Sequence, residues 1–268
     1  MQIKSNGSTF HFRVDGERGP WVLLSHGLAT DLSMWDELAD ALSDRFRVLR
    51  YDARGHGGSA ATEGDYTLDQ LVDDAAGILD ALEVPQAHFC GLSMGGMVGL
   101  GLMLNHARRI KSAVIADSRH TTTPEFTKAW LDRAEAVRQD GIEAIVQSTV
   151  ERWSSAGLRE RDPAAITRIE KMVRNTSAPG YRGCAAALAR LDYGHRLGEI
   201  RHTTLVLCGS EDHGAPPENT RQMHAMIKGS RFLEIEGAGH ISNIEKPVIF
   251  NAAVAKLFDD VEQGGASL

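Results

Sequence analysis

A serine lies between glycines in the stretch Gly91–Gly95 (GLSMG), directly after an apolar run and directly before a stretch with helical character. A chain that leaves a strand and enters a helix within one residue forces the residue at the junction into a strained backbone conformation. Glycines at positions 91 and 95 have no β-carbon that could collide across such a turn. The hydroxyl of Ser93 would then stand at the N-terminus of a helix, where amides and the helix dipole favour negative charge. The pattern therefore indicates a nucleophilic serine.

A serine hydroxyl needs a general base to attack a carbonyl, and the base needs an acid that orients it. Around a G-x-S-x-G turn these groups follow in the chain order Ser, then Asp or Glu, then His. Asp212 lies in the turn GSEDHGAP after the apolar run TLVLC, and His240 lies in EGAGHISN after the run RFLEI. Because both residues follow predicted strands, we expect Ser93, Asp212 and His240 to meet as a catalytic triad at one edge of the sheet.

Four further residues are rivals for the roles of acid and base. Glu211 adjoins the predicted acid, although a shift of one residue points its side chain elsewhere, and Asp117 directly follows the apolar run SAVIA. His213 and His26 are the alternative bases: His213 precedes the last predicted strand, and His26 lies in the segment SHGLAT. The sequence favours Asp212 as the acid and His240 as the base over these four alternatives.

Acyl transfer also requires backbone amides that point at the developing negative charge. The N–H of Met94, the residue after Ser93, becomes available with the turn itself. The second donor should follow the run WVLLS, where the chain reads SHGLAT, and we predict the N–H of Leu28. These two amides would form the oxyanion hole.

Phosphate and metal chemistry find less support in the sequence. The segment RYDARGHGGS holds Arg54, His56 and three glycines, a composition that resembles a phosphate-binding loop, but no Lys-Ser or Lys-Thr pair follows. We therefore expect a tight structural turn there. The 11 histidines form no HExxH or HxH pattern with nearby carboxylates, so we expect no metal and no cofactor.

The elements that must position these groups alternate between strand and helix. Strands are predicted at Thr9–Val14, Trp21–Ser25, Phe46–Tyr51, Ala87–Leu92, Ser112–Ala116, Thr204–Cys208 and Arg231–Ile235. Helices are predicted at Asp31–Ser43, Thr67–Leu82 and Gly95–Asn105, between the last two strands, and from Glu245 to about Val261. This alternation predicts a mostly parallel, doubly wound α/β sheet.

The alternation stops between about residue 121 and residue 196, where only helical periodicity remains. The prolines that interrupt it are Pro124, Pro163 and Pro179. We therefore expect a core of residues 1–120 and 197–268 with one helical cap, residues 121–196, over the strand ends where open α/β sheets bind ligands. Residues 262–268 (EQGGASL) are expected to form a frayed tail.

Composition and charge restrict the classes of binding partner and the cellular compartment that we expect for this protein. The 268 residues carry 29 basic and 36 acidic side chains and no basic block, so neither nucleic acid nor an anionic membrane surface is expected as a partner. No apolar window of about 18 residues and no signal-peptide pattern occurs. Cys90, Cys184 and Cys208 show no CxxC spacing, which indicates buried thiols in a reducing, cytoplasmic compartment. The oligomeric state stays open.

Together these motifs resemble the α/β-hydrolase superfamily and its fold. The segments that carry the likeness are HGL at 26–28, RYDARGHGGS at 50–59, GLSMGG at 91–96, GSEDHGAP at 209–216 and GAGHISNIE at 237–245. The branch most similar is the beta-ketoadipate (3-oxoadipate) enol-lactone hydrolases, which DLSMW at 31–35, FRVLRYD at 46–52 and RW at 152–153 resemble. The resemblance implies a Ser93–His240–Asp212 triad, an oxyanion hole from Leu28 and Met94, and a helical cap that defines the substrate.

The predicted cap also holds candidates for substrate binding. Trp153 is expected to line the pocket, and Arg152 is the alternative that would face the site and bind a substrate carboxylate with two hydrogen bonds. These predictions describe a cofactor-free serine hydrolase of a small-molecule carboxylic ester or lactone that acts through an acyl-enzyme. Three alternatives stay open: perhydrolysis as in cofactor-free haloperoxidases, hydrolysis of a C–C bond on the same triad, and a ligand-sensing protein with vestigial turnover.

Overall fold

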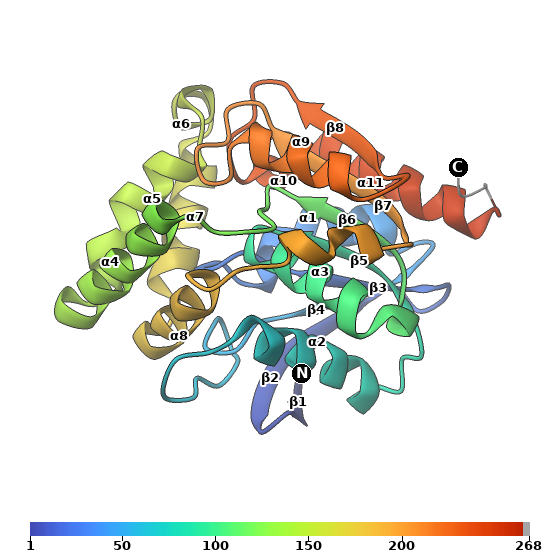
Figure 1. The fold of residues 1–268 in the computed structure, drawn as a ribbon, viewed down its shortest axis with the longest axis horizontal. Helices are drawn as coiled ribbons and strands as arrows, with labels where there is room; N and C mark the ends of the chain where they lie inside the picture. Colours follow the sequence, from blue (N-terminus) through green and yellow to red (C-terminus); the bar gives the residue numbers. More distant parts are fainter. Residues whose placement is uncertain (265–268) are drawn as a thin grey trace.

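The computed structural model describes residues 1–264 and is built around one 8-stranded sheet with the order β1-β2-β4-β3-β5-β6-β7-β8 (Figure 1). The strands are β1 Gln2–Ser5, β2 Ser8–Asp15, β3 Trp21–Ser25, β4 Arg47–Tyr51, β5 Ala87–Leu92, β6 Ile110–Ala116, β7 Thr203–Gly209 and β8 Arg231–Ile235. Strands β3 to β8 pair in parallel, while β1 and β2 add an antiparallel edge beside β4. The predicted doubly wound, mostly parallel sheet is therefore confirmed.

The short apolar runs of the sequence form the centre of this sheet. Strands β3 (WVLLS) and β5 (AHFCGL) are buried along nearly their whole length, because helices cover both faces of a parallel sheet. The three cysteines are buried and free, as predicted. The sequence prediction missed β1, since its residues QIKS alternate between exposed and half-buried positions at the edge and offer no apolar run.

Helices lie on both faces of the sheet, where α1 packs against α11 and α2 packs against α3. The helices and 3-10 turns beside the sheet are η1 Leu32–Trp35, α1 Asp36–Leu42, α2 Leu68–Ala81, α3 Met94–Asn105, η2 Ala107–Arg109, η4 Gly194–Glu199, α9 Pro217–Met226, α10 Ser242–Glu245 and α11 Pro247–Glu262. Helix α2 begins where the sequence predicts, because the hydroxyl of Thr67 accepts the Gln70 N–H at 3.1 Å.

The chain between β6 and β7 forms helices that gather at one side of the sheet, coloured green and yellow in Figure 1. They are α4 Pro124–Asp140, η3 Ile142–Ile145, α5 Val146–Trp153, α6 Ala156–Arg161, α7 Pro163–Arg174 and α8 Ala178–Leu188. The three prolines of this region stand in the first turns of α4, α7 and α8, where the missing N–H has no intrahelical role. We call residues 121–196 the helical segment.

The prediction of one final helix starting at Glu245 is wrong at its beginning. The structure has two helices there, α10 and α11, separated at Lys246. Lys246 has φ −133° and ψ 57°, outside the helical region. The reason is Pro247, because the residue before a proline is disfavoured in helical geometry.

The prediction of a frayed tail from residue 262 is also wrong at its first residue. Glu262 is the last residue of α11, and its carboxylate contacts His88 Nε2 at 2.7 Å and Lys111 Nζ at 2.5 Å. These two contacts hold the end of the helix against β5 and β6. The last four residues of the predicted tail, 265–268, lie outside the described residues.

Candidate active site

Ser93 lies at the sharp turn between β5 and α3. Its backbone has φ 56° and ψ −115°, and a conformation of this kind costs a residue other than glycine about 1–3 kcal/mol. The neighbouring glycines permit the turn: a β-carbon on Gly95 would lie 2.0 Å from Ser25 O, and one on Gly91 would lie 2.3 Å from Gly95 O. The Ser93 N–H donates to Ala116 O at 2.9 Å, which ties the turn to the end of β6.

Three side chains far apart in the sequence meet above this turn. His240 Nε2 lies 3.0 Å from Ser93 Oγ, and His240 Nδ1 lies 2.9 Å from each carboxylate oxygen of Asp212. Asp212 Oδ1 also accepts the N–H groups of Gly214 at 2.7 Å and Ala215 at 2.8 Å, which fix the carboxylate. This hydrogen bonding assigns the imidazole proton to Nδ1 and leaves Nε2 free to accept the serine proton.

The three side chains meet because each follows a parallel strand. Ser93 follows β5, Asp212 follows β7 and His240 follows β8, and the carboxyl ends of parallel strands share one edge of a sheet. Asp212 and His240 are buried, while Ser93 is only half-buried. The hydroxyl is thus the most accessible of the three groups.

The rival acids and the rival base His213 lie elsewhere. Glu211 and His213 are exposed. Asp117 is fully buried, and its carboxylate accepts the Ser242 hydroxyl at 2.5 Å rather than contacting the imidazole. Burial and the nearby Asp212 carboxylate raise the pKa of Asp117 well above its ordinary value.

The predicted oxyanion donors belong to backbone that adjoins Ser93. Met94 is the first residue of α3, and the first N–H groups of a helix have no intrahelical partner. On the other side, a β-carbon on Gly27 would lie 3.5 Å from Ser93 Cβ, so the segment after β3 runs directly beside the serine. Leu28 follows, and then Ala29, whose φ of 59° turns the chain sharply.

Two buried histidines link this loop to the segment after β4. His26 Nε2 accepts the Ala53 N–H at 2.8 Å, and His26 Nδ1 lies 2.7 Å from Gly27 O. His56 Nε2 accepts the Ala29 N–H at 3.0 Å. Burial, with repulsion from His26, lowers the pKa of His56 to about 3, so the ring stays neutral and keeps its acceptor nitrogen. His26 is therefore part of the loop's support, not a rival base at the serine.

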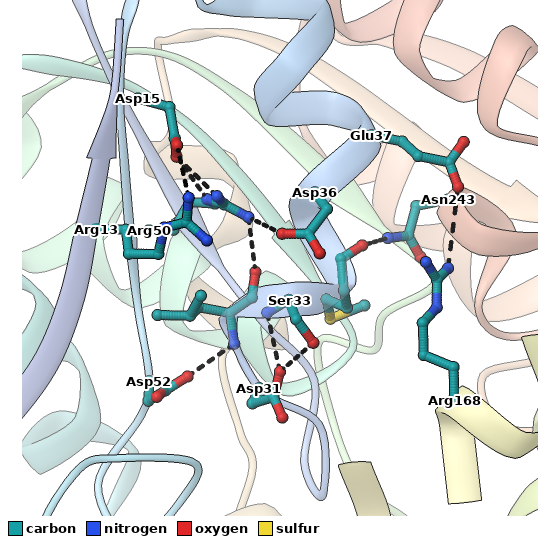
Figure 2. A network of polar contacts seen from close by, with 12 residues as sticks. Arg13, Asp15, Asp31, Ser33, Asp36, Glu37, Arg50, Asp52, Arg168 and Asn243 are labelled. Atoms are coloured by element: carbon teal, nitrogen blue, oxygen red, sulfur yellow. Dashed lines mark hydrogen bonds and ion pairs between the residues drawn. The ribbon is translucent and has the colours of Figure 1, made fainter. Parts of the chain in front are cut away.

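Polar side chains hold the far end of the same loop (Figure 2). The guanidinium of Arg50, in β4, bonds Leu32 O at 3.3 Å, and the carboxylate of Asp52 accepts the Leu32 N–H at 2.7 Å. From the C-terminal part of the chain, Asn243 of α10 donates to Met34 O at 2.8 Å. The loop between β3 and α1 is thus fixed by β4 on one side and by α10 on the other.

Trp153, at the C-terminal end of α5, lies close to the histidine, and Arg152 directly precedes it in the same helix. The ring centroid of Trp153 is 6.0 Å from that of His240, and Trp153 O accepts the His240 N–H at 2.8 Å. In the described part of the chain, the guanidinium of Arg152 bonds a carbonyl and a hydroxyl but forms no ion pair with a carboxylate. Burial lowers the pKa of Arg152 to about 10; Arg133 adds to this effect, and the Asp212 carboxylate opposes it.

Sequence reasoning missed residues that support the site without touching the serine. His56, Arg50 and Asp52 hold the loop after β3, and Glu245 lies beside the histidine with its side chain fully buried. Glu245 accepts the Gly239 N–H at 3.0 Å. The available signal was a charged residue within or next to an apolar stretch, in RYD and in HISNIE, because a buried charge needs specific partners.

A doubly wound sheet with a strand–turn–helix serine bonded to a histidine and an aspartate defines a class of hydrolytic enzymes. The chain belongs to the alpha/beta hydrolase fold family, whose sequence model matches residues 20–247.

Relatives agree with this assignment and with the branch that the motifs resemble. The chain is 36% identical to 3-oxoadipate enol-lactonase 2 of Acinetobacter baylyi over 235 residues, 88% of this chain and 87% of that one. It is also 36% identical to 3-oxoadipate enol-lactonase 1 of the same organism over 251 residues, 93% of each chain. The crystal structure of the enol-lactonase from Burkholderia xenovorans LB400 superposes with a TM-score of 0.93 and 38% identity, covering 97% of this chain and 100% of that one. The protein is a hydrolase, and the resemblance predicted from the motifs is confirmed.

Two further observations concern other classes of site. Within residues 1–264, no helix has both the length and the apolar character needed to cross a membrane. The same residues contain no group of three or more His, Cys, Asp or Glu side chains arranged to hold a metal ion. The cytoplasmic location and the lack of a cofactor stay predictions.

Proposed function

We propose that this protein is a serine hydrolase that cleaves a carboxylic ester or lactone through an acyl-enzyme. The observation that carries the proposal is the hydrogen-bonded series from Ser93 Oγ to His240 at 3.0 Å and from His240 to Asp212 at 2.9 Å. At these distances a proton can pass directly from the hydroxyl to the imidazole as the oxygen attacks. The carboxylate, fixed by two backbone amides, would hold the imidazole in the required tautomer and stabilise the imidazolium.

The reaction would proceed in two halves. Ser93 Oγ attacks the acyl carbon while His240 Nε2 takes its proton, and the imidazolium then protonates the departing oxygen as the tetrahedral intermediate collapses. In a lactone that oxygen stays attached to the acyl group, so ring opening leaves one acyl-enzyme and no separate alcohol. In the second half, His240 removes a proton from water, the water attacks the ester carbonyl, and the proton returns to the serine oxygen.

The oxyanion of each tetrahedral intermediate would be bound by the amides of Leu28 and Met94. Met94 supplies a helix N-terminal N–H, and the first turn of α3 adds the positive end of the helix dipole. The loop that carries Leu28 is held by buried polar contacts from Asp52, which directly follows β4, and from α10. Such prior fixation matters because donors that need no reorganisation stabilise the transition state most effectively.

For the substrate, we propose a lactone or ester that carries a carboxylate, with 3-oxoadipate enol-lactone as the first compound to test. Two relatives and one structural neighbour are named enol-lactonases. Arg152 supports the choice, since it is a half-buried cation without a carboxylate partner within residues 1–264. The Asp212 carboxylate also interacts electrostatically with it. A substrate carboxylate would neutralise it with charge-assisted hydrogen bonds. Trp153, beside His240, would form an apolar wall of the same site.

We also propose that residues 121–196 act as a cap over this site, on a core of residues 1–120 and 197–268. The support is that the helical segment enters and leaves between β6 and β7, next to the strand ends that carry the triad. It also supplies Trp153 and Arg152. A cap of this kind would set the size and charge of accepted substrates while the core performs the chemistry.

The test of the mechanism is Ser93→Ala assayed on p-nitrophenyl acetate and on the enol-lactone. From triad deletions in other enzymes we expect kcat to fall by roughly 10³–10⁶-fold. Full turnover in the folded variant would overturn the proposal. Assaying the wild-type protein on lactones, aryl esters and diketones, each with and without peroxide, separates ester hydrolysis from perhydrolysis and from C–C bond cleavage.

The test of the substrate class is Arg152→Gln, with Arg138→Gln on the exposed face of α4 as the matched control. We expect KM for the carboxylate-bearing lactone to rise by roughly 10–100-fold, as expected for the loss of a charge-assisted pair, and KM for the uncharged aryl acetate to stay within about threefold. An equal rise for both substrates would show that Arg152 serves the fold and not carboxylate recognition.

A further inference from the structure

A buried carboxylate near the histidine has no part in the mechanism above. Glu245 ends α10 with a side chain 0% exposed, and donors from two parts of the chain surround it. The Gly239 N–H donates to it at 3.0 Å, the Ser155 N–H at 3.3 Å, and the Ser155 hydroxyl donates as well. Arg161 Nη2 lies 3.6 Å from the carboxylate. We call these four residues the Glu245 cluster; a buried charge with so complete a set of partners is a specific structural element.

The Glu245 cluster joins the helical segment to the loop that carries the histidine. Ser155 is the N-cap of α6 and Arg161 is its last residue, whereas Gly239 directly precedes His240. A second contact runs beside the first, since the His240 N–H donates to a carbonyl at the end of α5 at 2.8 Å. We call the residues where α5 ends and α6 begins, Trp153–Ser155, the corner between α5 and α6. The amide of residue 239 is bound to this corner through Glu245, and the amide of residue 240 donates directly to Trp153 O.

The corner between α5 and α6 also packs tightly against the loop that carries His240. A β-carbon on Gly239 would lie 2.5 Å from Trp153 O and 3.0 Å from Ser155 N, so backbone packs directly on backbone. A displacement of the corner by about 1 Å would have to move the histidine loop with it, and shifts of that size in a catalytic group cost about 10²-fold in rate.

We propose that Glu245 is a positioning residue that aligns the general base: it binds the corner between α5 and α6 to the His240 loop, so that the imidazole faces Ser93 only while the helical segment is seated on the core. The inference rests on the proposed role of His240 as base. It makes the helical segment part of the catalytic geometry in addition to a wall of the substrate site. A molecule whose segment lifts to admit substrate loses base alignment until the segment returns.

The direct test is Glu245→Gln in the full-length protein, assayed on p-nitrophenyl acetate. Glutamine keeps the size and one acceptor oxygen, but its amide nitrogen cannot accept the second set of donors. We expect kcat per active site to fall by roughly 10- to 100-fold with KM within about threefold, because alignment of the base and not binding is lost. Labelling of Ser93 by a fluorophosphonate should slow in parallel. Glu236→Gln, an exposed carboxylate on the same loop, is the control and should match the wild type.

A matched pair of serines separates positioning from general docking of the helical segment. Ser155 and Ser177 each cap a helix of that segment and each donate a hydroxyl towards the core, Ser155 to Glu245 and Ser177 to Gly55 O at 2.7 Å. Both alanine variants lose a helix cap worth about 1 kcal/mol, and Ser155→Ala also loses a hydrogen bond to a buried carboxylate, so both are assayed under conditions where they are fully folded. Only Ser155→Ala should lower kcat, and it should add little to Glu245→Gln because both changes break one cluster.

Each outcome decides the inference. Wild-type kcat in folded Glu245→Gln, or equal kcat losses in Ser155→Ala and Ser177→Ala, would overturn it. If Glu245→Gln does not fold, the two serine variants give the answer alone. Turnover that survives Ser93→Ala overturns the proposed function instead, whereas inactive Ser93→Ala together with fully active Glu245→Gln overturns only the role of Glu245.

Discussion

His56 is a buried base whose titration should couple acid conditions to the stability of the loop beside Ser93. Its ring is 0% exposed, with Nε2 accepting the Ala29 N–H at 3.0 Å and Nδ1 3.0 Å from Arg54 O. Burial, reinforced by repulsion from His26, lowers its pKa from 6.5 to about 3, although the Arg54 carbonyl and the Asp52 carboxylate act in the opposite direction. Protonation would add a charge in the interior and remove the acceptor for the Ala29 amide.

The size of the effect follows from the two pKa values. The unfolded chain binds the His56 proton near pH 6.5, while the folded protein binds it only near pH 3, so between these values the unfolded state carries more protons. The free energy of unfolding therefore falls as the pH drops from 6.5 towards 3 and is unaffected by His56 above this window. Each pH unit inside the window costs about 1.4 kcal/mol, so acidification to about pH 5 should cost about 2 kcal/mol.

Urea unfolding of the wild type and His56→Gln, at about pH 7 and about pH 5, isolates this contribution. Glutamine can still accept the Ala29 N–H but does not titrate. Other groups titrate in both proteins, so the stability gap between them should shrink by about 2 kcal/mol on acidification. His195→Gln, at an exposed position, is the control and should lose stability in step with the wild type. A gap that stays constant between the two pH values would refute the assignment of acid sensitivity to His56.

Two further predictions concern a glycine beside Ser93 and a buried ion pair. Gly95→Ala should destabilise the protein by roughly 3 kcal/mol or more in urea unfolding, since its β-carbon would lie 2.0 Å from Ser25 O. The control is Gly198→Ala, which has open space around it and should be nearly neutral. Equal losses of stability in the two variants would contradict the steric argument. Asp74→Asn leaves the guanidinium of Arg54 buried without its charge partner, both side chains being 2% exposed, and should lower Tm by about 6 °C or more in calorimetry. A shift below about 2 °C would show that the buried pair contributes little.

The parts of this fold that the sequence predicted are those determined by local pattern. A central parallel strand must be apolar on both faces, so runs such as WVLLS and AHFCG are visible without knowledge of their neighbours. The turn around Ser93 depends on glycines within two residues of it. The chain order of the three site residues, each after a strand, then places Asp212 and His240 at the same edge.

The parts that the sequence did not predict depend on contacts between distant segments. His56 matters because its ring reaches Ala29, and Glu245 matters because its carboxylate reaches Ser155, 90 residues away. No periodicity within either segment encodes such a partner, since the contact exists only after the sheet has brought both loops to one edge. The sequence did not predict strand β1 for a related reason. An edge strand is defined by the strand it pairs with more than by its own composition.

Ser93 has a strained backbone conformation that its surroundings stabilise. Both polar groups of its backbone are satisfied from the end of β6, by Ala116 O at 2.9 Å and by the Ser118 hydroxyl at 2.8 Å, so the surroundings hold the strained conformation in place. Glycine would adopt φ 56° at little cost, and a serine there forgoes about 1–3 kcal/mol of stability. A sequence selected for stability alone would not place a β-carbon at this turn. The strain therefore supports the proposal that Ser93 is the nucleophile, independently of its hydrogen bond to His240.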